Sequence, residues 1–470
     1  MDPILAVDFG STYTKAALID RAAAQVVASA HAPSTVGSDV TLGLRQVLSE
    51  VSAKVGRDIR KVPALACSSA AGGLRVAIIG LVPALSLEAA RRAALGAGAK
   101  IIAAYGYKLT AKPLADLERL APDIVLLAGG TDGGDEETIL HNARLLARSP
   151  ISAPIVVAGN QVVQQECLDL LQAAGKPARP ADNLLPEVGR IEVRSVHDII
   201  RDLFIHRITH AKGIDRVRDY LDLVADIVPT PSAVLEAARL VSEGTAKSKG
   251  LGDTVVIDVG GATTDVHSVA SGAPTRPGVV VRGLPELRLK RTVEGDLGMR
   301  INAATIVERY GRAEVFALAE ALQPAVAMAE EDVDRYTAHV SARTEHIPAD
   351  ARERSLDCAL GRAAVRLAMQ RHAGAIRQVY THKGPVPVQE GKDLGEVAAI
   401  IGVGGVLAHG ADARFVLEGA LDSGTDPFSL LPRNAALYLD RRYVLYGIGL
   451  LAGISEEAAL ATAHNVLEEL

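Results

Sequence analysis

Residues 6–15 read AVDFGSTYTK, and residues 257–266 read IDVGGATTDV. Each stretch starts as a short apolar strand that ends in an aspartate, passes through a turn of glycine and hydroxyl residues, and resumes as a second strand. This strand–turn–strand unit occurs once in each half of the 470-residue chain. The repetition predicts two lobes that each open with the same hairpin.

The first turn has the chemistry of a phosphate-binding loop. Its candidate nucleotide ligands are Gly10, Ser11, Thr12, Thr14 and Lys15. The glycine allows close backbone approach, the amides and hydroxyls donate to anionic oxygens, and the lysine adds a positive charge. Asp8, at the end of a buried strand, is placed to hold Mg²⁺ directly or through water. Taken alone, this turn is better explained as an ordinary polar hairpin, because short motifs recur by chance.

The second turn repeats the same logic and makes two unrelated turns the weaker interpretation. Its candidate ligands are Gly260, Gly261, Thr263 and Thr264, with Asp258 before them as a second Mg²⁺ carboxylate. Two such hairpins, one from each lobe, would hold one phosphate chain and its metal ion from opposite sides. Residues 400–407, IIGVGGVL, supply a third element. This buried strand ends in Gly402, Gly404 and Gly405 and opens a helix, which suits approach to an adenosine ring or an α-phosphate.

Between these motifs the chain changes character. Residues 62–171 alternate strand and helix patterns, which predicts an α/β layer with a largely parallel sheet. Residues 243–252 are small, polar and glycine-rich and form the best linker candidate. Residues 299–378 read as mostly helical.

Composition excludes several classes of protein. Apolar residues make up 49% of the chain, charged residues 23%, and the net charge is −6, so we expect a folded protein without a basic nucleic-acid surface. Aromatic residues reach only 3% and tryptophan is absent, which disfavours base- or sugar-stacking sites. Three scattered cysteines, no signal peptide and no membrane-length apolar run predict a soluble cytoplasmic protein.

In order and spacing, residues 6–15, 257–266 and 400–409 resemble the phosphate-1, phosphate-2 and adenosine motifs of the actin/Hsp70/sugar-kinase ATPase superfamily. Residues 231–234, 294–298 and 436–451 are similar to its first connecting helix, acidic-glycine element and final connecting helix. The resemblance implies an α/β fold of two lobes, each a ribonuclease H-like domain, with an α/β expansion in the first lobe.

The domains and site roles follow from this resemblance. The first lobe is expected over residues 1–245 and includes the α/β segment 62–171. The second lobe is expected over 246–434 with the helical segment 299–378, and residues 435–470 form a helix that connects back to the first lobe. Mg-ATP would lie in the cleft. The expected catalytic residues are Asp8, Asp258 and Asp265, and the first two would also hold Mg²⁺ and the attacking water.

Four segments carry a closer resemblance, to the MutL-like accessory proteins encoded beside glutamate mutase, which are unrelated to the mismatch-repair protein of that name. These segments are ACSSAAGGLRVAIIGLVP (66–83), VLLAGGTDGGDEE (125–137), PIVVAGN (154–160) and DVGGATTDVHS (258–268). The resemblance implies an ATP-dependent reactivating chaperone for an adenosylcobalamin-dependent mutase. Residues 265–270 fall one residue short of the cobalamin signature Asp-x-His-x-x-Gly, so the cobalamin is expected on the client enzyme.

Two alternatives stay open at this point: a small-molecule kinase of the same fold, and a scaffold that binds nucleotide without hydrolysing it. The sequence does not separate the roles of Asp8 and Asp258, and it does not identify the client mutase. It also leaves homo-oligomerisation and the role of residues 62–171 open.

Overall fold

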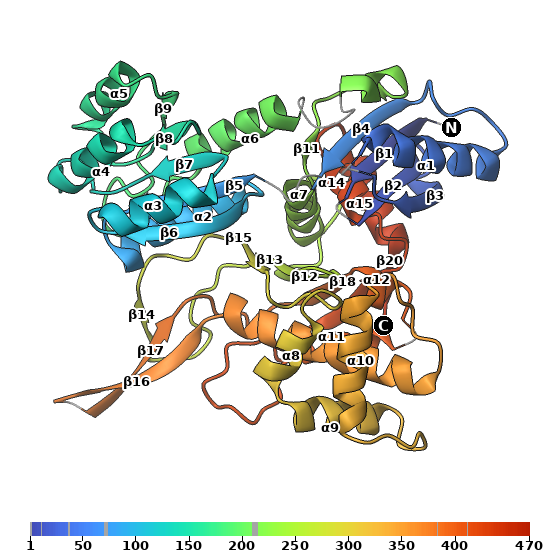
Figure 1. Ribbon diagram of the computed structural model, residues 1–470. Coiled ribbons are helices and arrows are strands. Elements are labelled where there is room, and N and C mark those ends of the chain that lie inside the picture. The colour runs from blue at the N-terminus through green and yellow to red at the C-terminus, as the bar shows by residue number, and fades with distance from the viewer. Residues whose placement is uncertain are drawn as a thin grey trace.

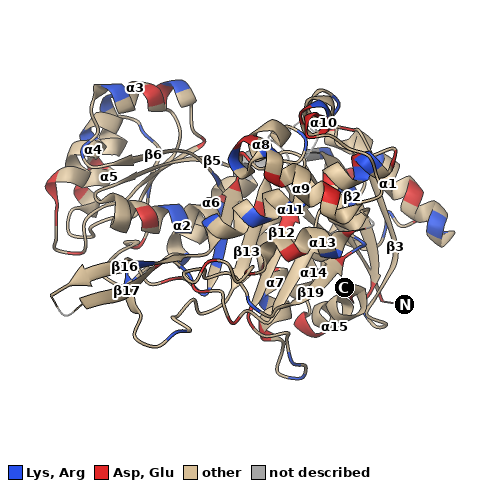
Figure 2. Cartoon of the chain, turned by 90° about the horizontal axis from the view of Figure 1, so that it is seen from below, with Lys and Arg blue, Asp and Glu red and all other residues tan. Residues whose placement is uncertain are grey.

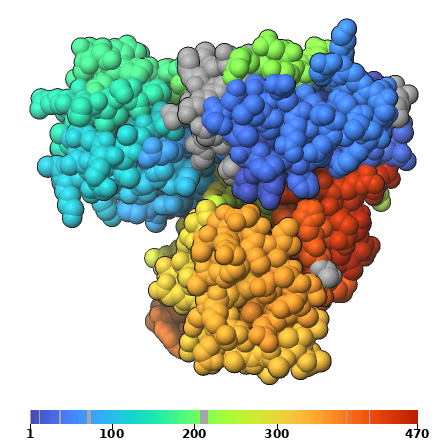
Figure 3. All heavy atoms as spheres, turned by 45° about the vertical axis from the view of Figure 1, so that its right-hand side comes forward, coloured from blue at the N-terminus to red at the C-terminus, as the bar shows by residue number. Residues whose placement is uncertain are grey.

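A computed structural model describes residues 2–10, 12–35, 38–69, 74–208, 215–382, 384–410 and 412–470. The chain forms three bodies: two lobes, each built on a mixed sheet, and an α/β unit beside the first lobe (Figures 1 and 3). Lysine and arginine residues are interspersed with aspartate and glutamate residues over all three bodies (Figure 2). In the described ranges, no helix combines the length and apolar character that crossing a membrane requires.

The first lobe is built on a sheet whose strand order is β10-β4-β1-β2-β3. Its strands are β1 (Pro3–Phe9), β2 (Tyr13–Asp20), β3 (Gln25–Pro33), β4 (Pro63–Ser68) and β10 (Asp222–Leu223), with β11 (Val228–Pro229) pairing at the end of β4. Helix α1 (Val40–Val55) packs on β2 and β3. The helix begins where the Asp39 carboxylate accepts from the Thr41 amide, and it ends at Gly56, whose φ is 68°.

The α/β unit has a wholly parallel sheet of order β6-β5-β7-β8-β9. Its strands are β5 (Arg75–Gly80), β6 (Lys100–Gly106), β7 (Ile124–Leu127), β8 (Ile155–Val157) and β9 (Ala178–Pro180). Its helices are α2 (Glu88–Gly96), α3 (Ala111–Leu120), α4 (Glu137–Arg148) and α5 (Gln164–Ala173), and α6 (Arg194–Ile208) follows them. The predicted parallel sheet is confirmed. The expected start at residue 62 is wrong, because β4 pairs with β1 in the first lobe.

The second lobe repeats the first. Its sheet has the order β15-β13-β12-β18-β19-β20. The strands are β12 (Thr254–Val259), β13 (Thr264–Val269), β15 (Leu289–Glu294), β18 (Ala399–Val403), β19 (Ala436–Asp440) and β20 (Leu467–Glu469). In both lobes the first strand pairs antiparallel with the second and parallel with a later strand. This shared strand order confirms the predicted duplicated two-lobed fold.

Helices and one small sheet complete the second lobe. The helices are α8 (Ala303–Tyr310), α9 (Arg312–Leu322), α10 (Glu331–Ala342), α11 (Ala351–His372), α12 (Gly405–Ala408) and α13 (Ala413–Leu417). A separate three-stranded sheet has the order β14-β17-β16 and contains β14 (Val280–Arg282), β16 (Ala375–Thr381) and β17 (Gly384–Glu390). The prediction of helix to residue 378 is therefore wrong at its end. A Cβ at Gly374 would lie 2.4 Å from the Glu390 carbonyl oxygen, and the chain turns there into the hairpin.

Three helices join the lobes: α7 (Thr230–Glu243), α14 (Leu445–Ala452) and α15 (Glu456–Val466). Helices α7 and α14 pack so closely that a Cβ at Gly449 would lie 1.8 Å from the Ala233 carbonyl oxygen. Their apolar residues form one core with residues from both sheets. The final connecting helix, expected over 436–451, is shorter than predicted because residues 436–440 form β19 of the second lobe.

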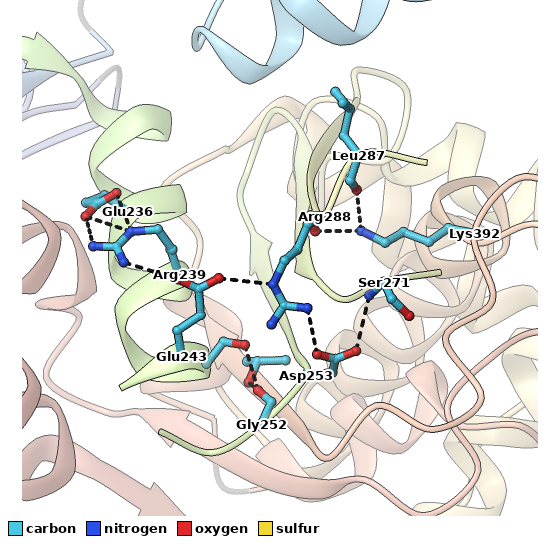
Figure 4. A network of polar contacts seen from close by, with 11 residues as sticks. Glu236, Arg239, Glu243, Gly252, Asp253, Ser271, Leu287, Arg288 and Lys392 are labelled. Atoms are coloured by element: carbon cyan, nitrogen blue, oxygen red, sulfur yellow. Dashed lines mark hydrogen bonds and ion pairs between the residues drawn. The ribbon is translucent and has the colours of Figure 1, made fainter. Parts of the chain in front are cut away.

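The predicted linker over residues 243–252 is held by polar contacts (Figure 4). The Ser242 hydroxyl donates to the Gly252 carbonyl at 2.7 Å. The Arg288 guanidinium donates to Glu243 at 3.0 Å and to Asp253 at 3.2 Å. These contacts tie the end of α7 to the start of β12.

Candidate functional site

The ammonium group of Lys15 lies where the two lobes meet. It is 3.0 Å from Asp8 Oδ2, on the facing position of the β1–β2 hairpin. It also lies 3.6 Å from the centre of the Tyr443 ring and 5.6 Å from that of Tyr446. Because both tyrosines come from the segment that follows β19 of the second lobe, the lysine is held from both sides.

Asp8 is a buried and fully engaged carboxylate. It is 1% exposed. Its Oδ1 accepts a hydrogen bond from the Thr230 hydroxyl at 2.6 Å and a weak one from the Cys67 thiol at 3.5 Å, while Oδ2 binds Lys15. Burial and the neighbouring Asp8 charge raise the pKa of the Cys67 thiol, so this cysteine is a packed neutral thiol.

The two glycine turns have the same geometry. The Gly10 amide donates to the Tyr13 carbonyl at 3.0 Å, and the Gly260 amide donates to the Thr263 carbonyl at 2.9 Å. A Cβ at Gly10 would lie 2.5 Å from the Tyr13 oxygen, so this close turn requires glycine. Thr12 is exposed at the first turn, and Ser11 lies outside the described residues. In the second turn, the Gly261 carbonyl accepts from two amides of residues 300–301.

The second hairpin carries a carboxylate where the first carries a lysine. Asp258 faces Asp265 across the β12–β13 pair, as Asp8 faces Lys15. Asp265 Oδ1 accepts from Arg291 at 2.7 Å, and its Oδ2 accepts from the Thr263 hydroxyl at 3.0 Å. Arg291 is 7% exposed and compensates the Asp265 charge. Both carboxylate oxygens of Asp265 are therefore engaged within the second lobe.

The charge of Asp258 is less compensated than the charges of Asp8 and Asp265. Its Oδ1 is buried and has no hydrogen-bond partner among the described residues. Burial raises the pKa of Asp258 to about 6, against the opposing effect of Lys15 and with contributions from Asp265 and Asp8. Burial alone would lower the pKa of Lys15, but Tyr443, Asp8 and Asp258 raise it overall. These mutual effects bring Lys15 and both aspartates into one electrostatic cluster.

Two predicted ligands point away from this cluster. Thr14 is paired with Phe9 and is buried, and a Cβ at Gly43 of α1 would lie 2.9 Å from its hydroxyl. Thr264 is also buried, and its hydroxyl donates to the Leu297 carbonyl at 2.7 Å. Because side chains alternate along a strand, both hydroxyls lie on the sheet face opposite to Lys15 and Asp265. We therefore remove both threonines from the predicted phosphate ligands.

The three glycines after β18 have different environments. Gly402 is packed in the core, where a Cβ would lie 2.7 Å from Leu417, so its prediction as a nucleotide contact is wrong. Gly404 has φ 112°, and a Cβ there would lie 2.3 Å from the Val259 carbonyl oxygen. Gly405 opens α12 with free space on its Cβ side. Of these three glycines, Gly405 is the one that presents an open surface to a ligand.

Sequence reasoning missed Thr230, Asp440 and Tyr443. Asp440 ends β19 and is fully buried; its Oδ2 accepts the Leu445 amide at 2.7 Å, and its Oδ1 has no partner among the described residues. Burial raises the pKa of Asp440 to about 6. An aspartate at the end of a buried strand, as at Asp8 and Asp258, was a signal that could have identified it. Thr230 and Tyr443 carry no local signal.

The residues present fit Mg-ATP. Within the described ranges, no three histidine, cysteine or acidic side chains are grouped to hold a metal ion. Mg²⁺ usually takes only one or two protein carboxylates and completes its shell with water and substrate phosphates, so such a group is not required. The unpartnered oxygen of Asp258 supplies a carboxylate, and Lys15 supplies a positive charge for phosphate oxygens.

Comparison with known proteins identifies the family. The MutL protein family matches residues 4–467. Protein MutL of Clostridium tetanomorphum is 41% identical over 453 residues, which cover 96% of each chain. The chain belongs to the MutL protein family. This confirms the resemblance that the four segments of sequence carry.

Solved structures are more distant from this MutL-family chain. An acetone carboxylase in its nucleotide-free form is 13% identical, with 96% of this chain and 70% of that chain covered and a TM-score of 0.38. The activator of 2-hydroxyisocaproyl-CoA dehydratase from Clostridium difficile, with bound ADPNP, is 10% identical, with 99% and 98% covered and a TM-score of 0.34. Because these TM-scores lie below 0.5, the fold assignment rests on the strand order of the two lobes.

Proposed function

We propose that this protein binds and hydrolyses Mg-ATP in the cleft between its lobes and acts as an accessory, reactivating factor for an adenosylcobalamin-dependent mutase. The observation that carries the ATP site is the cluster formed by Lys15, Asp8 and Asp258. Both lobes contribute to it, and each does so from the same hairpin. The mutase client is supported by the four segments that resemble mutase accessory proteins.

In this proposal the two aspartates have different roles. Asp8 positions Lys15, because both of its oxygens are already engaged. Asp258 has an unpartnered oxygen and would hold the metal ion or the attacking water. Bound Mg²⁺ would neutralise phosphate charge. The amides at Gly10 and Gly260 and the open side of Gly405 would contact the nucleotide.

Arg291 supports a route from the cleft to the α/β unit. Its guanidinium donates to Asp265 at the second turn and to the carbonyls of Leu95 and Ala99, at 3.2 and 3.4 Å, at the end of α2. A change at the second turn on nucleotide binding or hydrolysis would therefore act on α2. We propose the α/β unit as the part that transmits this change to the client.

The test is steady-state Mg-ATP hydrolysis with and without a purified adenosylcobalamin-dependent mutase. We expect the wild-type rate to rise with the mutase, and Asp258→Asn to lose hydrolysis. Binding of labelled ATP, measured in parallel, separates loss of chemistry from loss of binding. ATP binding without turnover under either condition would refute the ATPase mechanism and leave a scaffold. A phosphorylated small molecule as the product would replace the proposal with a kinase.

A further inference from the structure

Strand β16 has an open edge on an arm of the second lobe. It is the outer strand of the order β14-β17-β16, and the β16–β17 hairpin extends away from the rest of the lobe (Figure 1). Its side chains are unusually exposed for apolar residues: Tyr380 is 80% and Val379 40% exposed. A two-stranded hairpin exposed in this way gains little from its own packing.

The prolines of β17 show which backbone groups face outward. Pro385 pairs with Tyr380, and Pro387 pairs with Gln378. Proline has no N–H, so these two pairs are the ones that exchange no hydrogen bonds within the hairpin. The N–H and C=O groups of Gln378 and Tyr380 therefore point to the outer edge of β16. The bond from the Ile376 amide to the Phe428 carbonyl, at 3.4 Å, lies on that same edge and agrees with this alternation.

The two edges of the hairpin are treated differently by the sequence. On the β17 side, β14 pairs with Val388–Glu390, and the two prolines prevent another strand from pairing with the rest of β17. The outer edge of β16 has no proline. In the described part of the chain, the outward backbone groups of Gln378 and Tyr380 have no hydrogen-bond partner. One edge is closed to strand addition and the other is open.

We propose that the open edge of β16 pairs antiparallel with β16 of a second copy of this chain, so that two arms form one continuous six-stranded sheet and a symmetric dimer. The available groups fix the register. Gln378 of each copy then faces Tyr380 of the other, since within the described strand β16 these two residues carry the outward groups without a partner. Val379 then faces Val379 of the partner at the two-fold axis.

The side chains fit this self-pairing. The charged residues described in the hairpin strands are Arg377 and Glu390; Figure 2 shows the hairpin largely in the neutral colour. In the register given, Arg377 faces Thr381 of the second copy, so no like charges are opposed. The two Val379 side chains meet in a pair without hydrogen bonds, where side chains approach most closely.

A cysteine pair tests the register. Val379→Cys places one thiol from each copy at the axis, and we expect a disulfide-linked dimer under mild oxidation. The native Cys67, Cys167 and Cys358 are all buried and do not compete. Arg377→Cys is the control, since Arg377 is also exposed on β16 and faces Thr381 of the second copy. Absence of the Val379→Cys dimer, or equal crosslinking of both variants, would overturn the proposal.

A proline substitution tests the edge without breaking the hairpin. Gln378→Pro removes an outward N–H and keeps every bond to β17, whereas Gln378→Ala keeps the N–H. Sedimentation of the full chain over a concentration series should show the dimer dissociation constant of Gln378→Pro raised by at least about tenfold, because a bond is lost in each copy. The Gln378→Ala constant should match wild type. Self-pairing would be refuted if the wild-type chain stays monomeric at all concentrations and Gln378→Pro loses binding to the mutase. That result would show that a client strand pairs with this edge.

Discussion

Replacing Asp258 by asparagine isolates the free-energy cost of burying an uncompensated carboxylate. Burial raises the pKa of Asp258 from 3.8 to about 6. At 1.36 kcal/mol per pH unit, the folded protein is destabilised by up to about 3 kcal/mol above pH 6. Since Asp258 is only partly shielded from solvent, we expect Asp258→Asn to be about 1–2 kcal/mol more stable than wild type at pH 7.

The sign of the pH dependence follows from proton binding. Between pH 3.8 and about 6 the folded state holds the Asp258 proton more tightly than the unfolded state, so wild-type stability falls as pH rises through this window. The asparagine variant lacks this loss. Burial also raises the pKa of Asp440, so the pH dependence is measured as the difference between the two proteins and not from wild type alone.

Urea unfolding of wild type and Asp258→Asn at pH 4.5, 5.5, 6.5 and 7.5 measures the difference directly. We expect it to grow toward neutral pH, while ATP hydrolysis by the variant is lost. Asp8→Asn is the control with the opposite sign: it leaves Lys15 without its carboxylate and should cost about 3–5 kcal/mol. An Asp258→Asn variant that is less stable than wild type at pH 7, or a difference independent of pH, would refute the reasoning.

Three further outcomes are expected. Gly404→Ala should lower the free energy of unfolding by about 2–4 kcal/mol, because φ is 112° and a Cβ would meet a carbonyl oxygen. Gly405→Ala should change the free energy of unfolding by less than about 0.5 kcal/mol, measured with urea. This second variant should instead raise the KM for ATP. Thr230→Val removes a hydrogen bond to the buried Asp8 carboxylate and should lower the free energy of unfolding by about 1.5–3 kcal/mol. An unchanged midpoint of thermal or urea unfolding would count against that bond. Arg291→Gln should abolish ATP-dependent hydrogen-exchange protection of α2 while ATP hydrolysis continues. Protection of α2 that survives in this variant would exclude Arg291 as the route from the cleft to the α/β unit.

The fold could be predicted from the sequence because its decisive signals are local. Each strand–turn–strand unit lies within about ten residues and carries its own apolar pattern and glycine turn. Helix α1 also carries a local signal, because its apolar residues recur at helical spacing. The small β14-β17-β16 sheet was missed, since β14 is distant in sequence from the β16–β17 hairpin and the exposed residues of these strands carry no buried-strand pattern.

The candidate site was predicted only in part, for a related reason. Thr14 and Thr264 have the right chemistry for phosphate, but strand alternation turns them to the opposite face, where each meets a core. Their pairing opposite the buried Phe9 and Val259 would have revealed this direction. Tyr443 reaches Lys15 only through the packing of the two lobes, which no local pattern encodes.

The duplication itself separates the two aspartates that the sequence left equivalent. Both hairpins place an aspartate before the turn and a charged residue opposite it, so the difference between the lobes lies in that opposite residue. Lys15 neutralises Asp8, and Thr230 takes its remaining oxygen. Asp265 repels Asp258 and is itself neutralised by Arg291, which leaves Asp258 Oδ1 without a partner. Asp258 is half-buried, its buried Oδ1 has no partner among the described residues, and its pKa is raised. Such a carboxylate gains most from a bound cation, so the metal ion should follow Asp258 and not Asp8.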